Sequence, residues 1–123
     1  MARYQVIRQA DSESVVLRRA RLAVSFWDHF RGLMLAAPLS DDEGMLFVTR
    51  RDNRTETTIH MFFMRYDLGV VWVNDAGIVV DKQLAKRWRP YYAPAQPARY
   101  FIEANPSILE RVTVGDHLVF ADA

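Results

Sequence analysis

Apolar and polar positions divide this chain into short hydrophobic runs that are separated by polar turns. The runs are rich in β-branched and aromatic residues, which predicts strands rather than helices. The predicted strands cover residues 3–9, 15–17, 45–48, 58–63, 70–73, 78–80, 99–104 and 117–121. The tetrapeptide Asn74-Asp75-Ala76-Gly77 lies between two of these runs. Its turn residues predict a β-hairpin there, which is the strongest local signal in the chain.

Helical signals are confined to two short segments. Ser25 is a candidate N-cap for residues 26–34, where Phe26, Phe30, Leu33 and Met34 have the 3-to-4 spacing of one helix face. Pro106 suits the first position of a second helix that runs to residue 111. Strands and helices do not alternate regularly. We therefore expect a single α+β domain over residues 1–123, mainly β, with a compact antiparallel barrel-like sheet and two short helices.

Composition narrows the class of protein. Hydrophobic residues make up 50% of the chain, which is enough for a folded core. The 16 basic and 15 acidic residues nearly balance, so no overall charge attracts nucleic acid or an anionic membrane. The absence of cysteine excludes disulfides, thiolate metal sites and a cysteine nucleophile. No run approaches the roughly 20 apolar residues of a membrane span, and the N-terminal residues lack a signal-peptide core, so we expect a soluble cytoplasmic protein.

Residues 59–65 (Ile-His-Met-Phe-Phe-Met-Arg) set one imidazole and one guanidinium into a run of large apolar side chains. A buried polar group without a partner costs about 2–7 kcal/mol, so the two polar side chains are either satisfied within the core or line a binding site. In a strand, alternation places His60 and Met64 on one face and Arg65 on the other. His60 and Met64 would then lie roughly 13 Å apart, too far to share a metal ion. The pattern predicts no metal site.

Five motifs follow one another in an order that resembles domain-of-unknown-function family 192. They are Arg31-Gly32-Leu33-Met34, Gly44-Met45-Leu46-Phe47, residues 59–65, residues 86–89 and Val114-Gly115-Asp116. The similarity covers roughly residues 15–120. It implies a compact β-rich domain found in bacteria and archaea, with no established activity. Members usually have Asp where this chain has Gly69, so Asp67 would have to replace it in any pairing with the arginine or histidine of the central motif.

The candidate ligand-binding residues are His60, Arg65, Lys86 and Arg89. An arginine beside an apolar strand can hold a carboxylate or phosphate through two parallel hydrogen bonds. The alternative for Arg65 is an internal ion pair with Asp67 or with an acid in a loop. The basic and aromatic stretch at residues 82–92 could likewise contact phosphates and bases, or form a solvated loop anchored by its aromatic side chains.

Catalytic motifs are missing from the sequence. There is no nucleophile elbow, no phosphate-binding glycine loop and no zinc-protease motif, and the three histidines lack metal-ligand spacing. We therefore predict no catalytic residues and no cofactor. The preferred function is a binding or accessory module for a small anionic ligand or an acidic peptide segment, rather than an enzyme. Two alternatives stay open: a hydrolase with His60 as general base, and weak single-stranded nucleic-acid binding through residues 82–92.

Overall fold

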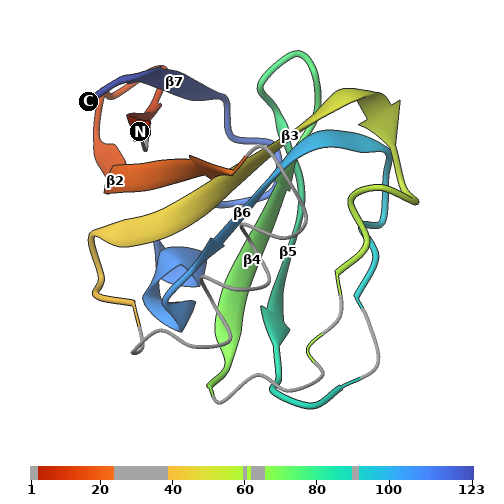
Figure 1. Cartoon of the computed structure of the whole chain (residues 1–123). Coiled ribbons are helices and arrows are strands. Elements are labelled where there is room, and N and C mark those ends of the chain that lie inside the picture. Colours follow the sequence, from red (N-terminus) through yellow and green to blue (C-terminus); the bar gives the residue numbers. More distant parts are fainter. Residues whose placement is uncertain (1–2, 24–38, 60, 62–65, 90–91) are drawn as a thin grey trace.

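The computed structural model describes residues 3–23, 39–59, 61, 66–89 and 92–123 of the chain (Figure 1). These residues form a seven-stranded sheet with the order β5-β4-β6-β3-β2-β1-β7. The elements are β1 (Tyr4–Gln9), β2 (Val15–Ala23), β3 (Glu43–Asn53), β4 (Leu68–Val73), β5 (Val79–Ala85), β6 (Ala98–Ala104), the 3₁₀-helix η1 (Pro106–Glu110) and β7 (Leu118–Asp122). Within the described ranges, no helix is long and apolar enough to cross a membrane.

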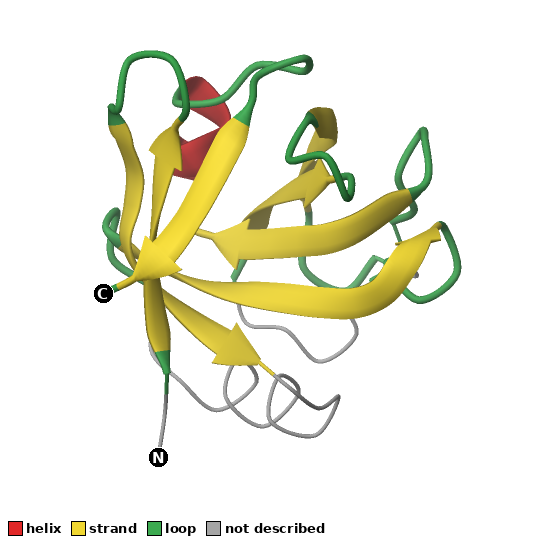
Figure 2. Cartoon of the chain, turned by 90° about the horizontal axis from the view of Figure 1, so that it is seen from above, coloured by secondary structure: helices red, strands yellow, loops and turns green. Residues whose placement is uncertain are grey.

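The sheet is mainly antiparallel, as the sequence predicts, and it is strongly curved (Figure 2). Its one parallel pair joins β2 to β3 at the middle of the strand order. The predicted hairpin is confirmed, because β4 and β5 pair antiparallel on either side of the turn at residues 74–77. In that turn the Asn74 Oδ1 accepts the N–H groups of Ala76 and Ile78 at 3.0 and 2.9 Å.

The prediction of a barrel-like sheet is wrong, because the edge strands β5 and β7 do not pair along their length. In the described part of the chain they meet only where both begin, through the Ile78–His117 bridge and the adjoining backbone bond between Gly115 and Val79. One backbone N–H group within β5 and one just beyond its end bond side chains instead of another strand. The N–H of Lys82 donates to the Asp81 carboxylate at 2.8 Å, and the N–H of Lys86 donates to the Tyr92 hydroxyl at 2.9 Å. Side chains thus occupy positions that a closing strand would need.

The prediction of two short helices is also not met in the part of the chain that the structure describes. There η1 is the one helix, and it is a 3₁₀-helix of five residues. Pro106 opens it, as predicted, and the Asn105 side chain accepts the N–H of Ser107 at 3.0 Å. A segment of this length closes only one or two hydrogen-bonded turns, which suits 3₁₀ geometry. Residues 26–34, where the other helix is predicted, lie outside the described residues.

Two hydrophobic clusters cover the two faces of the sheet. The first packs η1 against the strands, and its members include Ile7, Leu17, Leu46, Val71, Ile102 and Ile108. The second includes Met45, Met61, Leu68, Val70, Trp72 and Phe101. Alternate residues of β4 enter alternate clusters, so all six are buried. The β4 strand is therefore the centre of the core.

Gly69 is the point of closest approach between β4 and η1. A Cβ atom there would lie 2.7 Å from Ile108 Cγ2 and 3.2 Å from the Asn105 carbonyl oxygen. An aspartate, which the family resemblance leads one to expect here, does not fit unless η1 shifts. The glycine therefore serves helix packing, and it lies on the face of the sheet that carries the first cluster.

Candidate functional site

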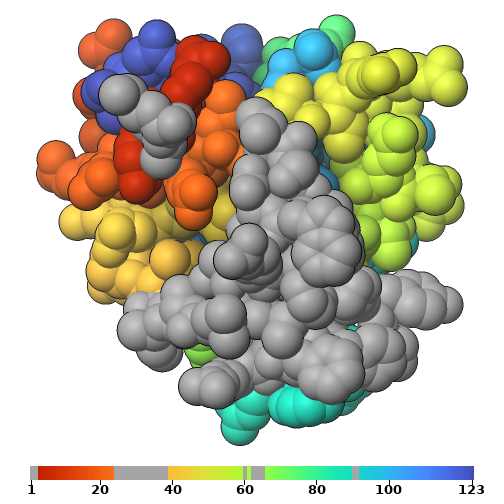
Figure 3. Space-filling view, viewed as in Figure 1, coloured from red at the N-terminus to blue at the C-terminus, as the bar shows by residue number. Residues whose placement is uncertain are grey.

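The structure describes two of the four predicted binding residues, Lys86 and Arg89. They are the first and last residues of a tight turn. The turn comprises residues 86–89 and follows β5 directly. The N–H of Arg89 donates to the Lys86 carbonyl at 3.3 Å, which closes the turn. Figures 1 and 3 place it at the lower edge of the molecule, at the teal end of β5 and well away from both chain termini. His60 and Arg65 lie outside the described residues.

Backbone hydrogen bonds fasten this turn to the central hydrophobic segment. Ile59 and Tyr92 exchange a pair of bonds at 2.9 and 2.7 Å. The N–H of Trp88 donates to the Met61 carbonyl at 2.7 Å, and the N–H of Met61 donates to the Arg89 carbonyl at 3.2 Å. Ile59 and Met61 are both buried, so the turn is anchored on the core. Ile59 joins Tyr92 as an isolated bridge rather than as part of a strand, so the predicted strand at 58–63 is not seen at its described positions.

The cations of the predicted basic stretch fall into two groups. The side chains of Lys82 and Arg87 make hydrogen bonds or ion pairs to other residues of the protein. The Lys82 Nζ donates to the carbonyls of Leu109 and Val112 at 2.7 and 2.8 Å. Arg87 pairs with Asp67 at 3.7 Å, and its own N–H donates to the same carboxylate oxygen at 2.8 Å.

Lys86 and Arg89 form the other group, because both are exposed and neither side chain bonds an acid or a carbonyl within the described ranges. They stand on either side of Trp88, whose side chain is 57% exposed. The turn therefore presents two available cations next to an aromatic ring. An arginine and a lysine in such a setting can bind a carboxylate or phosphate group from solvent.

Asp67 bears on the alternative in which an internal acid neutralises Arg65. In the structure its carboxylate accepts from the backbone of Arg87 and pairs with the Arg87 guanidinium. This carboxylate thus holds the chain after residue 65 against the turn. A further role in pairing with Arg65 or His60 stays a prediction.

Glu103 is a candidate that the sequence reasoning missed. It is 1% exposed and lies in β6, directly between Met45 of β3 and Val70 of β4. Alternation puts it on the same face as Phe101, in the midst of the second hydrophobic cluster. Glu103 is an acidic residue inside the apolar predicted strand at 99–104, just as His60 and Arg65 are polar residues inside an apolar segment. The same pattern could therefore have identified Glu103.

The Tyr66 hydroxyl interacts electrostatically with Glu103. Burial and, secondly, the negative charge of Glu103 raise the pKa of the Tyr66 hydroxyl above its ordinary value of 10.0. Both causes favour the neutral phenol. Tyr66 and Glu103 are therefore electrostatically coupled.

Replacing Tyr66 by phenylalanine is expected to weaken the dependence of stability on alkaline pH. The folded protein holds the Tyr66 proton more tightly than the unfolded chain does. The resulting stabilisation is complete below about pH 10 and is lost as the pH rises through the folded-state pKa. Urea unfolding at about pH 8 and about pH 10.5 measures it. Wild-type protein should lose more free energy of unfolding between the two conditions than Tyr66→Phe, and equal losses would contradict the assignment.

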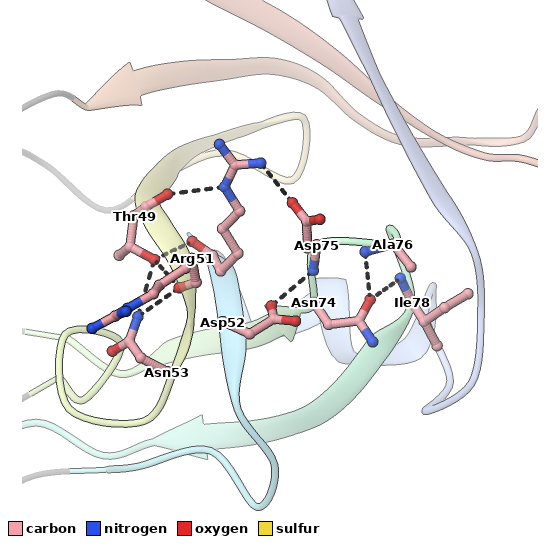
Figure 4. A network of polar contacts seen from close by, with 9 residues as sticks. Thr49, Arg51, Asp52, Asn53, Asn74, Asp75, Ala76 and Ile78 are labelled. Atoms are coloured by element: carbon pink, nitrogen blue, oxygen red, sulfur yellow. Dashed lines mark hydrogen bonds and ion pairs between the residues drawn. The ribbon is translucent and has the colours of Figure 1, made fainter.

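A polar network at the opposite end of the sheet has a structural role (Figure 4). Arg99 of β6 donates to the Asp75 carboxylate at 2.6 Å and to the Thr49 carbonyl at 3.0 Å. Asp52 in turn accepts the N–H of Asp75 at 2.8 Å. The network ties the β4–β5 turn to β3 and β6, and within it Arg99 is paired with Asp75. Among the described residues, no group of three potential metal ligands occurs here or elsewhere.

Comparison with known proteins places the chain among uncharacterised relatives. The family model DUF192, described as "Uncharacterized ACR", matches residues 6–120. A UPF0127 protein of Thermococcus gammatolerans is 40% identical over 93 residues, which are 76% of this chain and 59% of that protein. A UPF0127 protein of Pyrococcus furiosus is 36% identical over 100 residues, covering 80% of this chain and 83% of the relative. The chain thus spans about three fifths of the length of some archaeal relatives and most of others.

Two solved structures have a similar fold. One is a proposed transcription regulator from Sinorhizobium meliloti, with a TM-score of 0.77 and 21% identity, covering 98% of this chain and 94% of the other. The second is a protein of unknown function from Novosphingobium aromaticivorans, with a TM-score of 0.78 and 21% identity, covering 96% and 84%. At this identity the likeness shows the fold alone.

Proposed function

Because this chain belongs to the uncharacterised DUF192 family, we propose its function from its own residues: it is a binding module for anionic groups. Its ligand is a small anionic molecule or an acidic peptide segment. Lys86 and Arg89 supply the charges that bind it. The single observation that carries the proposal is the pair of exposed cations, without side-chain partners among the described residues, on a turn fixed to the core.

The fixed backbone of the turn supports binding because it is organised before a ligand arrives. The bonds of Trp88 and Arg89 to Met61, and of Lys86 to Tyr92, hold three of its four residues. The remaining residue, Arg87, is held by Asp67. A ligand that meets such a turn need not order the backbone, and this lowers the entropic cost of association.

His60 and Arg65 stay in the proposal as sequence predictions. The described residues on either side of the segment 62–65 are Met61 and Tyr66, and Asp67 follows. Met61 bonds the turn through its backbone, and Asp67 bonds it through its carboxylate. This neighbourhood supports adding His60 and Arg65 to the Lys86 and Arg89 set. The hydrolase alternative depends on His60 and gains no support from the described residues.

The internal hydrogen bonds of Lys82 and the ion pair of Arg87 disfavour the nucleic-acid alternative. Binding to single strands depends on neutralising several successive phosphates along a groove. Of the four cations at positions 82–89, two are engaged by carbonyls or by Asp67, which leaves Lys86 and Arg89. Two cations match one carboxylate cluster or one phosphate better than a run of nucleotides.

Titration of the wild-type protein with labelled probes tests the proposal. The probes are the peptide Asp-Glu-Ser-Asp-Glu, an uncharged Ser/Gly peptide of equal length and a thymidine oligonucleotide, each followed by fluorescence anisotropy. Citrate and inorganic phosphate, added as competitors, distinguish a small-molecule site from a peptide site. The acidic peptide should bind, the uncharged one should not, and binding should weaken as salt is raised. Absence of acidic-peptide and small-anion binding at low salt would refute the proposal, and preferential binding of the oligonucleotide would replace it.

A further inference from the structure

Trp88 is a large aromatic residue in an unusual backbone conformation. It occupies the third position of the 86–89 turn with φ of +68°, in the left-handed region. Glycine or asparagine usually fills such a turn position, because a Cβ atom crowds the backbone there. A bulky side chain at positive φ is an outlier, and outliers of this kind gather at functional sites.

Strain alone does not single out Trp88, since Glu13 has a similar φ of 62° in the turn between β1 and β2. The difference lies in the side chain and its surroundings. Glu13 is a polar residue in a solvent-exposed turn. Trp88 instead presents an indole that is 57% exposed, the most exposed of the large hydrophobic side chains in the described ranges. Of the available cations of the turn, Arg89 follows it directly, and Lys86 precedes it by two positions.

We propose that Trp88 is a binding residue of this turn, and that its indole packs against an apolar side chain within an acidic peptide segment of a partner protein. This inference rests on the proposed function and narrows the ligand to a peptide. The charges of Lys86 and Arg89 fit carboxylates that flank the apolar residue. Exposed tryptophan and arginine are the residue types on which binding energy concentrates at protein interfaces.

The edge of β5 limits how such a peptide can bind. Adding a strand to a sheet requires a row of free backbone groups along the edge. In β5 the Asp81 carboxylate accepts the N–H of Lys82, and just beyond the end of β5 the Tyr92 hydroxyl accepts the N–H of Lys86. The peptide therefore contacts the side chains of the turn and does not extend the sheet.

Two peptides and two variants test the inference. The peptides are Asp-Glu-Phe-Asp-Glu and Asp-Glu-Ser-Asp-Glu, and the variants are Trp88→Gly and Trp88→Phe. Wild-type protein should bind the phenylalanine peptide about fivefold more tightly than the serine peptide. Trp88→Gly should remove this preference without lowering the Tm, since glycine adopts positive φ freely. Trp88→Phe keeps an aromatic ring and should keep most of the preference.

The outcomes separate this inference from the proposed function. If both peptides bind wild-type protein equally and Trp88→Gly binds them as well as wild type does, the role of Trp88 is refuted while anion binding stands. If neither peptide binds wild-type protein, both fail. If Trp88→Gly is unfolded, Trp88→Asn, which also tolerates positive φ, replaces it. Loss of the preference in Trp88→Asn together with its retention in Trp88→Phe supports an aromatic contact, and retention in Trp88→Asn refutes one.

Discussion

Replacing Trp72 by alanine is expected to lower the free energy of unfolding by about 3–5 kcal/mol. Trp72 is fully buried in β4, the strand whose residues enter both core clusters. Its indole N–H also donates to the carbonyl of Thr57 at 2.7 Å, and Thr57 is itself buried. The variant thus creates a large cavity and leaves a buried carbonyl without this donor. Urea unfolding followed by circular dichroism measures the loss.

Two further variants keep this prediction testable. Trp72→Phe retains most of the apolar volume but not the hydrogen bond, so it should cost less, about 1–3 kcal/mol. Trp88→Ala removes an indole that is 57% exposed and should change stability by less than about 1 kcal/mol. If Trp72→Ala and Trp88→Ala lowered stability equally, the placement of Trp72 at the centre of the core would be wrong.

The double variant Lys86→Ala/Arg89→Ala is expected to weaken binding of the acidic peptide Asp-Glu-Ser-Asp-Glu about tenfold. Exposed ion pairs contribute about 0.2–1 kcal/mol each, and both side chains are exposed, so their joint loss approaches the 1.4 kcal/mol that corresponds to a factor of ten. The Tm should stay within about 2 °C of wild type, because neither side chain makes a hydrogen bond or ion pair with another described residue.

A matched control is Arg50→Ala/Arg51→Ala. These two arginines are exposed in β3, and their loss changes the net charge by the same amount. They precede Asp52, which bonds the β4–β5 turn at the opposite end of β5 from the 86–89 turn. If the control weakened binding as much as the double variant, net charge rather than the turn would be responsible.

Strand positions could be predicted where apolar residues gather, and strand lengths could not. The predicted strand at 15–17 extends to Ala23, and the one at 45–48 runs from Glu43 to Asn53. Most of the added residues are polar, and several of them, such as Arg18 and Arg51, are exposed, so they carry little hydrophobic signal. Pairing with neighbouring strands, rather than propensity, keeps them extended.

Whether the sheet closes into a barrel could not be predicted from the sequence, for a similar reason. The side chains of Asp81 and Tyr92 that occupy the edge of β5 bond residues 1 and 6 positions away in the chain. Nothing in residue type indicates that they would cap an edge strand instead of facing solvent. The open edge follows from where the chain after β5 turns back, which is a tertiary outcome.

For the site, the sequence indicated a basic stretch but not which cations remain available. Lys82 and Lys86 look alike in the printed sequence, yet Lys82 bonds two carbonyls near η1. The left-handed backbone of Trp88 has no sequence signal either, because tryptophan is not a residue that favours it. Glu103, by contrast, could have been recognised as an acid in an apolar run.

An NMR titration of the wild-type protein with Asp-Glu-Ser-Asp-Glu tests most directly whether the 86–89 turn is the binding surface. Amide chemical shifts report each residue separately, so they locate the contact without any substitution. We expect the largest shift changes at residues 86–89, with smaller ones at Met61 and Tyr92, whose groups bond the turn. Saturable changes centred elsewhere, for example at Arg50 and Arg51, or none up to about millimolar peptide would contradict the account.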